Sequence, residues 1–335
     1  MKRLLLLILL ILSTIAVNAQ HVETLQQGKF TSIRGLSVVD DNVAWISGSK
    51  GTIAITKDGG KTWNWTQVKG YEKSDFRDIE AFSSKDAIIM SSGTPALILK
   101  TNDGGETWQE KYKNTDTTYF FDAMDFDKPK HGLVLGDPIG GKFLLMETND
   151  SGETWHPFKN PPDALAGEGG FAASGTCLRV MDNSIEIVSG GLNTRFIDYN
   201  KKQKKWGYWA LPIMHAKPSQ GAFSIANGPD KTLFVGGDYA HDKITDSVAC
   251  YLSKSENEVV ISPMETKPAG FQSCVEYLKS NFFLSTGTPG SNITTDNGIT
   301  WRKIDDSSYN VCRKAKDGKL VLLAGDKGRI GIFKP

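Results

Sequence analysis

The sequence has few of the residues that build metal centres or disulfide frameworks. Its four cysteines form no Cys-x-x-Cys pair, and its five histidines form neither His-Glu-x-x-His nor His-x-His. Because zinc sites and small disulfide scaffolds need such spacings, we expect no metal. A Gly-x-Gly-x-x-Gly fingerprint is also absent, so the residues predict no nicotinamide or flavin cofactor.

An excess of charge of one sign is lacking as well. The 335 residues contain 39 Lys and Arg against 38 Asp and Glu. Proteins that bind nucleic acid by its phosphates usually carry a clear basic excess. We therefore expect no nucleic acid as partner.

Long apolar runs are missing except at the N-terminus. There Lys2 and Arg3 precede a leucine-rich run that ends in the small residues Val17-Asn18-Ala19. This pattern is typical of a secretory signal, and it predicts cleavage after Ala19 and export to the periplasm or the medium. A membrane anchor is the alternative, but the run is short for a bilayer span. The mature chain would start at residue 20 and have no membrane span.

An octapeptide, Thr-x-Asp-x-Gly-x-Thr-Trp, occurs four times. A β-rich run, a glycine-containing turn and a second β-rich run precede each copy, which predicts a tight turn between a third and a fourth strand. The aspartate can accept backbone N–H groups inside such a turn, and the glycine can adopt a positive φ. We therefore expect structural aspartates at Asp58, Asp103, Asp150 and Asp296.

The spacing of the repeat predicts the fold. The motif tryptophans Trp63, Trp108 and Trp155 are 45 and 47 residues apart, and Trp301 follows after room for two degenerate copies. Four-stranded units of this length are typical of a β-propeller. Six complete units and a three-stranded last unit predict an all-β, seven-bladed propeller over residues 20–335. The segment His21–Gly28 is the expected donor of the missing strand; six blades with an insertion is the alternative.

These repeats resemble the BNR/Asp-box family, which includes sialidases, some glucanases and the photosystem II stability/assembly factor group. The stretches FRDIEAF, GDPIGGKFLLMETNDSGETW, GFAASGT, KPSQGAFSI and VGGDY resemble the assembly-factor-like group of exported bacterial propellers. The resemblance implies a propeller over essentially the whole mature chain, and it says little about activity.

Candidate site residues lie where inner strands start and where second and third strands meet. Alignment of the inner strands puts one residue of each blade at the same level of the channel mouth: Arg34, Arg77, Phe121, Gly175, Gly221, Gln272 and Asn310. Arginine offers a forked donor to carboxylates. We expect binding residues at Arg34, Arg77, Lys142, Arg195, Lys217, Gln220 and Tyr239. Weaker catalytic candidates are the carboxylates Asp78, Asp122, Asp137 and Asp238.

Two functions remain open from the sequence. The first is an exported, non-catalytic binding or assembly module, a monomer that holds a protein, glycan or anionic ligand at the mouth. The second is an extracytoplasmic glycoside hydrolase of sialidase or glucanase type, which needs two facing carboxylates. The charges could also simply pair with one another along a wet channel. Among the cysteines, a Cys274–Cys312 disulfide is conceivable, but buried free thiols are expected.

Overall fold

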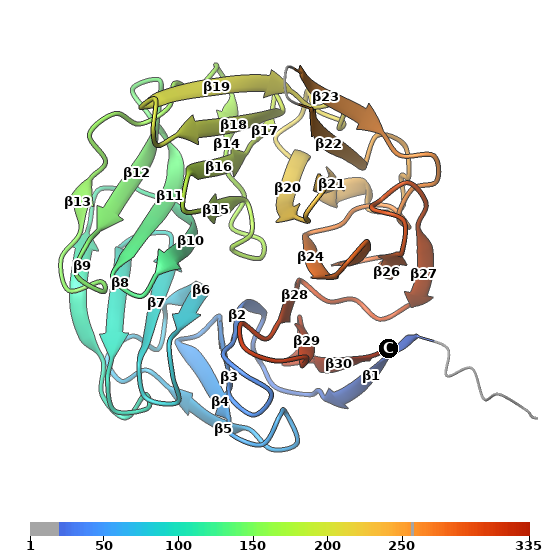
Figure 1. Ribbon diagram of the computed structural model, residues 1–335. Helices are drawn as coiled ribbons and strands as arrows, with labels where there is room; N and C mark the ends of the chain where they lie inside the picture. Colours follow the sequence, from blue (N-terminus) through green and yellow to red (C-terminus); the bar gives the residue numbers. More distant parts are fainter. Residues whose placement is uncertain (1–19, 256–257) are drawn as a thin grey trace, which may run out of the picture.

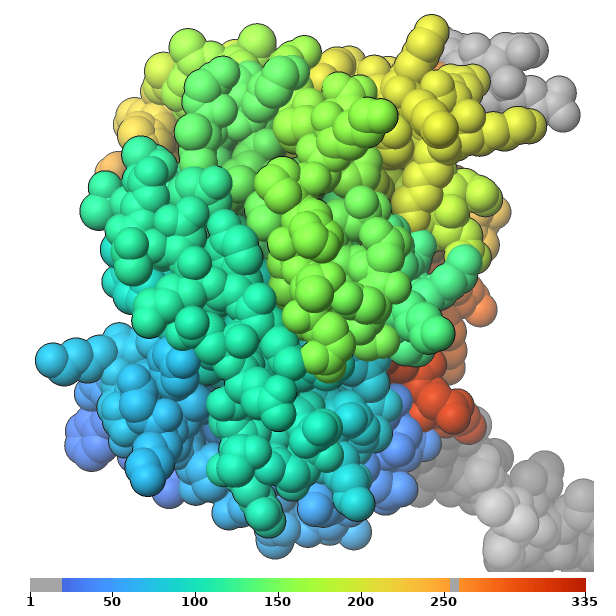
Figure 2. All heavy atoms as spheres, turned by 90° about the vertical axis from the view of Figure 1, so that its left-hand side faces the viewer, coloured from blue at the N-terminus to red at the C-terminus, as the bar shows by residue number. Residues whose placement is uncertain are grey.

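A computed structural model describes residues 20–255 and 258–335. The expected signal segment, residues 1–19, lies outside the described residues. The chain forms seven antiparallel sheets arranged as a ring around a central axis (Figure 1). The side view shows successive blades as adjacent bands of colour, from blue through teal to green (Figure 2). In the described part of the chain no helix has the length and hydropathy needed to cross a bilayer.

Each blade is a meander whose first strand lines the channel and whose fourth strand lies outermost. The first three blades follow the expected repeat, and the outer strand of the third is very short. Blade 1 contains β2 (Ile33–Val38), β3 (Ala44–Gly48), β4 (Thr52–Thr56) and β5 (Asn64–Gln67); blade 2 contains β6 (Asp75–Ala81), β7 (Ala87–Ser92), β8 (Ala96–Thr101) and β9 (Gln109–Asn114); blade 3 contains β10 (Phe121–Lys128), β11 (His131–Ile139), β12 (Lys142–Thr148) and β13 (His156–Pro157).

The degenerate repeats form blades 4 and 5, which confirms the count of seven. Blade 4 contains β15 (Leu178–Val180), β16 (Ser184–Val188), β18 (Arg195–Asn200) and β19 (Lys205–Ala210); blade 5 contains β20 (Gln220–Asn227), β21 (Lys231–Asp238), β22 (Ala249–Ser255) and β23 (Glu258–Pro263), with the 3-10 turn η1 (Tyr239–His241) after β21; blade 6 contains β24 (Cys274–Lys279), β25 (Phe282–Gly287), β26 (Gly290–Thr294) and β27 (Arg302–Asp305).

The N-terminal strand closes the ring, as expected. Blade 7 consists of β28 (Val311–Lys314), β29 (Val321–Ala324), β30 (Ile330–Lys334) and, as its outer strand, β1 (His21–Gln26). β1 pairs with β30 from His21 opposite Lys334 to Gln26 opposite Ile330, so the two ends of the chain lie side by side (Figure 1). This pairing satisfies the open edge that a three-stranded blade would expose.

The core lies between neighbouring blades because the middle strands bury both of their faces. Trp45 of β3 is fully buried, and its ring meets that of Trp108, from the next blade's repeat, edge-on at 6.4 Å. Trp155 lies in one buried cluster with Ile88 and Met90 of the preceding blade. The repeated tryptophans therefore join blades together. All four cysteines are buried and free, as expected.

The repeated octapeptides form turns between the third and fourth strands, as predicted. In the copy at Thr148, its hydroxyl donates to Asp150 Oδ1 at 2.8 Å and accepts the N–H of Gly152 at 2.9 Å. Asp150 also accepts the N–H and the hydroxyl of Thr154, at 2.9 and 2.6 Å. The same contacts recur at Asp58, Asp103 and Asp296.

A two-stranded extension covers the channel. β14 (Glu168–Gly169) and β17 (Gly190–Gly191) pair with each other and continue the sheet of blade 5 inward from β20. Residues 170–175, called the plug loop here, follow β14, and this connection to β15 reaches toward the centre of the ring (Figure 1). This extension between blades 3 and 4 was not predicted from the sequence.

Candidate functional site at the channel mouth

The channel mouth is a cavity of about 430 Å³ at the end of the ring opposite the Asp boxes. The strands alternate in direction, so inner-strand starts and second-to-third strand turns share this end. The cavity is bounded by the inner strands of several blades and by the plug loop. Its lining comprises Arg34, Arg77, Phe120, Asp122, Asp137, Gly170, Phe171, Ala172, Ala173, Phe223, Tyr239, Phe271, Ser273, Thr288, Asn310 and Asp326.

Four β-bulges aim side chains into this cavity. In each of four inner strands one residue near the start has no partner on the second strand, because the pairing register shifts around it. A bulge leaves one residue unpaired and turns its side chain away from the regular alternation. The four bulge residues are Arg34, Arg77, Asp122 and Phe223, and all four line the mouth.

Arg34 is the least satisfied of these side chains. Within residues 20–255 and 258–335 its guanidinium makes no hydrogen bond or ion pair that meets normal distance limits. Burial, and next the positive charge of Arg77, lower the pKa of Arg34 from its ordinary value. The charges of Asp326 and Asp75 oppose this lowering without forming an ion pair with Arg34. A partly buried guanidinium that has no ion pair gains free energy when an anion binds to it. Arg34 is therefore available to bind an anionic ligand.

Arg77 stands beside Arg34 with its own partners. Its Nε lies 2.8 Å from Asp75 Oδ2, and Nη1 donates to the carbonyl of Ala172 in the plug loop at 3.4 Å. The guanidinium also lies 5.9 Å from the centre of the Phe120 ring. Arg77 thus holds the plug loop and adds positive charge at the mouth.

Three carboxyl groups line the same cavity, those of Asp122, Asp137 and Asp326. Asp122 is 1% exposed, and its Oδ2 has no hydrogen-bond partner. Burial raises the pKa of Asp122 well above its ordinary value, and the charge of Asp137 raises it further. Burial also raises the pKa of Asp137, although Asp137 Oδ1 accepts the N–H of Gly170 at 3.3 Å. A neutral Asp122 can donate a proton to an acceptor in the cavity.

Aromatic rings form the opposite wall. Phe171 of the plug loop stacks on Phe223 with ring centres 3.6 Å apart. Phe271 and Tyr239 meet Phe223 edge-on at 4.8 and 6.2 Å. Tyr239 remains 53% exposed at the rim. The mouth therefore combines two neighbouring guanidiniums, a carboxyl group that can donate and an apolar wall. This lining suits a carboxylate attached to an apolar group.

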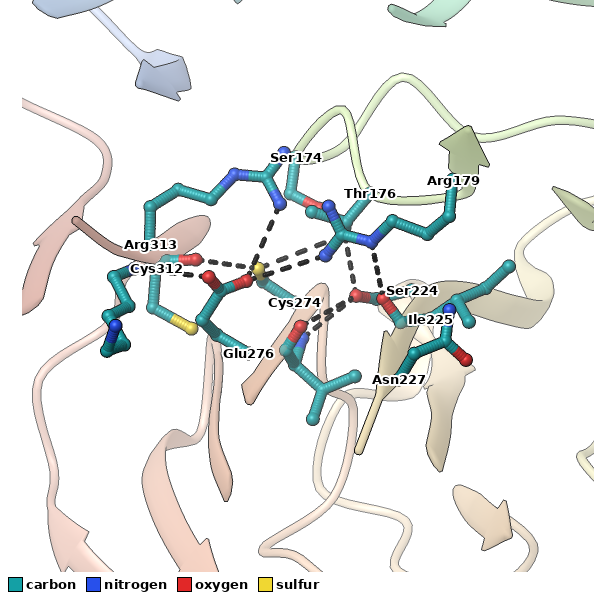
Figure 3. Close-up of polar contacts among 12 residues, drawn as sticks. Ser174, Thr176, Arg179, Ser224, Ile225, Asn227, Cys274, Glu276, Cys312 and Arg313 are labelled. Carbon is teal, nitrogen blue, oxygen red and sulfur yellow. Dashed lines mark hydrogen bonds and ion pairs between the residues drawn. The ribbon is translucent and has the colours of Figure 1, made fainter. Parts of the chain in front are cut away.

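Below the plug loop, polar side chains fill the channel (Figure 3). Ser174 donates to the carbonyl of Ser273 at 2.7 Å, and Thr176 donates to Ser224 at 2.6 Å. Farther down, Glu276 lies 3.5 Å from Arg179 and 3.7 Å from Arg313. These contacts cross the axis between blades 4, 5, 6 and 7. The mouth is thus a closed-ended cavity in which a ligand enters and leaves by the same side.

Asp78 lies in this filled part and not at the mouth. Its carboxylate accepts the N–H groups of Ile79 and Met124 at 2.9 and 2.8 Å. A Cβ on Gly175 would come within 2.2 Å of Asp78 Oδ2, so the plug loop needs glycine there. Burial raises the pKa of Asp78 to about 7. This carboxylate supports the fold and does not face a substrate, contrary to the expectation that placed it among the catalytic candidates.

The expected convergence of four basic residues does not occur. Arg34 and Arg77 line the cavity, but Arg195 forms a buried two-point contact with Glu168 and thereby fastens β14. Lys142 reaches outward to Asp163 at 2.5 Å and is half exposed. Sequence position placed both on loops at the correct end of the ring. The sequence could not reveal that Glu168 and Asp163, in the segment between blades 3 and 4, bind these two side chains outside the cavity.

Three further candidates lie outside the cavity. Asp238 caps η1: it accepts the N–H of Ala240 at 2.9 Å and the amide of Gln220 at 3.0 Å. Although burial opposes it, hydrogen bonding led by Gln220 lowers the pKa of Asp238 to about 2. Lys217 is exposed on the preceding connection. Tyr239, the predicted binding residue that follows Asp238 in the chain, does line the mouth.

The sequence did not predict the aromatic wall, and it misaligned two inner strands. The alignment used Phe121 as the third member of the level of Arg34, but Phe121 is buried in the core and Asp122 is the bulge residue. In blade 5 it used Gly221 in place of Phe223. A buried apolar residue precedes each bulge residue, at Ile33, Phe76, Phe121 and Ala222. Alignment on these apolar residues would have found Asp122 and Phe223.

The described residues contain no cluster of three or more His, Cys, Asp or Glu side chains that could hold a metal ion. The mouth has three carboxyl groups, Asp122, Asp137 and Asp326, beside two guanidiniums. Burial raises the pKa of Asp122 and Asp137 and so favours their neutral form. With these two carboxyl groups shifted toward neutrality, the guanidiniums favour an anionic ligand over a cation.

Comparisons with known proteins agree with this fold. Residues 16–116 match the family described as photosynthesis system II assembly factor YCF48. No curated protein sequence matches significantly. The fold is similar to that of the solved structure "YCF48 bound to D1 peptide", at 17% identity and a TM-score of 0.65, covering 94% of this chain and 97% of that one.

Two further solved structures have the same fold. YCF48 from Cyanidioschyzon merolae is 15% identical, with a TM-score of 0.65 over 94% of this chain and 99% of its own. The structure of U3-55K is 11% identical, with a TM-score of 0.63 over 94% and 98%. By its repeats and its ring of seven blades the chain is a BNR-type β-propeller, and residues 16–116 are similar to the photosystem II assembly factor family.

Proposed function

We propose that this propeller is a non-catalytic binding module that holds a carboxylate-bearing segment of a protein partner at its channel mouth. The observation that carries the proposal is the unpaired guanidinium of Arg34, which shares one cavity with the unpartnered Oδ2 of Asp122. A ligand carboxylate can accept from both groups, and its apolar neighbour can pack on Phe223 and Phe271. Each group that lacks a partner in the free protein gains one in the complex.

A protein segment suits this cavity better than a sugar. Two guanidiniums provide charge recognition, and the stacked rings of Phe171 and Phe223 provide a rigid apolar surface. A propeller of similar fold has been solved as "YCF48 bound to D1 peptide". That precedent supports a peptide ligand for this fold, and the residues of this mouth supply the chemistry for it.

The test is partner recovery from the envelope fraction of cells that produce the protein. Tagged wild-type protein, Arg34→Gln and Lys57→Gln are purified after cross-linking, and the co-purifying proteins are identified by mass spectrometry. Lys57 is exposed next to an Asp box, so its variant makes the same charge change at the other end of the ring. We expect a partner that is recovered with wild type and Lys57→Gln and lost with Arg34→Gln. Equal recovery with all three would refute the mouth as the binding site.

Glycoside hydrolysis is the second candidate, because Asp122 and Asp137 face the same cavity and Asp137 raises the pKa of Asp122. A neutral acid beside a second carboxyl group is the pairing such enzymes need. Burial of Asp122 against the plug loop weighs against it. Turnover in a glycan screen that both Asp122→Asn and Asp137→Asn abolish would replace the binding proposal.

The same proposal includes export. The basic residues Lys2 and Arg3, the leucine-rich run and Ala19 support removal of a signal segment. Intact-mass measurement of protein isolated from the envelope or medium tests it. The expected mass is that of residues 20–335, and a full-length mass in the cytosol would contradict it.

A further inference from the structure

Beside the mouth, a phenylalanine stands in solvent among lysines. Phe30, in the connection from β1 to β2, is 91% exposed. Lys29, Lys50 and Lys327 surround it, and together the four residues are called the Phe30 patch. They border a hollow of about 390 Å³ whose other lining residues are glycine, serine and threonine, with no acidic side chain among them.

Two of these lysines occupy backbone positions that lysine disfavours. Lys50 and Gly51 have φ of 60° and 62°, and Lys327 and Gly328 have φ of 58° and 61°. Hairpin turns with two positive φ angles prefer Asn-Gly or Gly-Gly, and blade 3 has Gly140-Gly141 there. A non-glycine residue in this region costs about 1 kcal/mol or more. The backbone geometry of the two turns therefore gives no reason for lysine at these positions. We look for the reason in what the lysine side chains contact.

The patch is rigid before any partner arrives. The carbonyl of Lys327 accepts the N–H groups of Gly28 and Lys29 at 2.8 and 2.9 Å. The hydroxyl of Thr31 donates to the carbonyl of Ser49 at 3.0 Å. These bonds tie the connection that carries Phe30 to the turns that carry Lys50 and Lys327. A preformed surface of this kind loses little conformational entropy on binding.

The charges of the patch are not neutralised within the molecule. None of its three lysines forms an ion pair with another described residue, whereas many other surface lysines do. Lys50 Nζ lies 5.8 Å from the centre of the Phe30 ring, and Lys29 Nζ lies 5.6 Å from that of Trp65. The complement of such a surface is a ligand with several negative charges and an apolar side chain.

Only one β-bridge separates the patch from the mouth. Ser32, which borders the hollow of the patch, pairs with Asp326, which borders the mouth, and its hydroxyl donates to that carboxylate at 2.5 Å. An extended chain leaving the mouth over this bridge meets the patch next. Successive residues of an extended chain advance about 3.3 Å, so a short segment suffices to reach it.

We propose that the Phe30 patch is a second docking point on the mouth face and that it takes an acidic protein segment with an apolar side chain that packs on Phe30. The proposal rests on the mouth function for the identity of the partner, which holds its carboxylate at Arg34 and its acidic segment at the patch.

A membrane surface fits the patch less well. Basic segments that bind anionic lipid usually carry four to eight Lys or Arg residues, each contributing about 1 kcal/mol. The patch has three lysines and a single exposed ring. Residues 20–335 as a whole carry 37 basic and 38 acidic side chains and so add no attraction.

The experiment measures fluorescence anisotropy of an end-capped, fluorescein-labelled peptide of repeated Glu-Glu-Leu. The decisive variant is Lys50→Asn/Lys327→Asn, because asparagine suits both turns, so folding is kept or improved. The matched control, Lys57→Asn/Lys61→Asn, removes the same charge from the exposed Asp-box end of blade 1. We expect affinity about tenfold weaker for the patch variant, severalfold weaker for Phe30→Ser and unchanged for the control.

Arg34→Gln, measured with the same peptide, separates this proposal from the mouth function. Loss of affinity with Arg34→Gln but not with the double asparagine variant supports the mouth and overturns the patch. The reverse pattern supports the patch, and partner recovery with Arg34→Gln then decides on the mouth separately. Failure of wild type to bind the peptide at millimolar concentration overturns the patch, as does Phe30-dependent binding to phosphatidylserine vesicles in place of the peptide.

Discussion

Aspartates at the two ends of this ring occupy opposite environments. At the Asp-box end, hydrogen bonds from the hydroxyl and N–H of Thr107 lower the pKa of Asp103 to about 2, and Asp58 and Asp150 behave alike. Away from these turns, burial raises the pKa of Asp78 to about 7 in the filled channel and that of Asp122 well above its ordinary value at the mouth. The four Asp-box carboxylates accept hydrogen bonds within their own turns, whereas Asp122 at the mouth has an oxygen without a hydrogen-bond partner.

The difference separates what holds the ring together from what the ring can bind. The Asp-box turns repeat because each of these blades needs the same turn, and the Thr and Asp side chains of each motif pair locally. The mouth residues do not repeat: two bulges carry arginine, one carries aspartate and one carries phenylalanine. Polar groups without hydrogen-bond partners lower the stability of the folded protein, and they are retained where a bound ligand supplies the missing partner. The three predictions below test whether stability and binding divide in this way.

The largest expected effect is a difference in pH dependence between Asp78→Asn and Asp103→Asn. Asp78 has a folded pKa of about 7 against an ordinary 3.8. Its contribution to stability is complete below 3.8 and is lost as the pH rises toward 7. The free energy of unfolding of wild type should fall, relative to Asp78→Asn, on the order of 3 kcal/mol between pH 4.5 and 7.5.

Asp103 supplies the control for that measurement. Its folded pKa of about 2 means that its contribution is present above 3.8 and is lost as the pH falls toward 2. The free-energy difference between wild type and Asp103→Asn should therefore be constant between pH 4.5 and 7.5. Urea denaturation of the three proteins at both pH values decides the matter. If the free energies of unfolding of the two variants, each relative to wild type, changed with pH in the same way, the Asp-box turns and the buried channel carboxylate would not differ as expected.

The second prediction concerns Arg34→Gln. Arginine in a desolvated interface position is often a main binding determinant, so affinity for the recovered partner should fall by about thirtyfold, or 2 kcal/mol. The free energy of unfolding should stay the same or rise, because the substitution removes a desolvated charge that has no partner. Binding is measured by titration calorimetry and stability by urea denaturation. A clear loss of stability would indicate that Arg34 serves the fold and not a ligand.

Much of the architecture followed from the sequence because local rules govern it. The octapeptide fixes a turn, the 45- and 47-residue spacings fix the blade, and the short last unit required a donor strand, which β1 supplies. Two degenerate repeats kept enough β-rich pattern to be counted. The inward extension by β14 and β17 was missed because two-residue strands rich in glycine carry no periodic signal.

The site was predicted less completely because it depends on contacts between distant segments. Arg34, Arg77 and Tyr239 were placed at the mouth correctly by their position in the blade. Arg195 and Lys142 were placed at the same end, but carboxylates of Glu168 and Asp163 hold them elsewhere. No pattern of neighbouring residues in the sequence predicts such pairs between distant segments. The bulges shifted one strand by a residue, which is enough to exchange a core Phe121 for a cavity-facing Asp122.

The smallest expected effect is on the Asp-box end and comes from Thr148→Val. Thr148 is fully buried, and valine keeps its shape but leaves the N–H of Gly152 without an acceptor. An unsatisfied buried donor costs about 1–2 kcal/mol, which urea denaturation can resolve. Thr117→Val, at an exposed site with no hydrogen bond from its hydroxyl among the described residues, is the matched control. Binding of the partner should be unchanged in both, because the turn lies at the opposite end of the blade from Arg34. A loss of affinity with Thr148→Val at full folding would mean that the two ends are coupled through the blade, and that the repeated turn contributes to function as well as to stability.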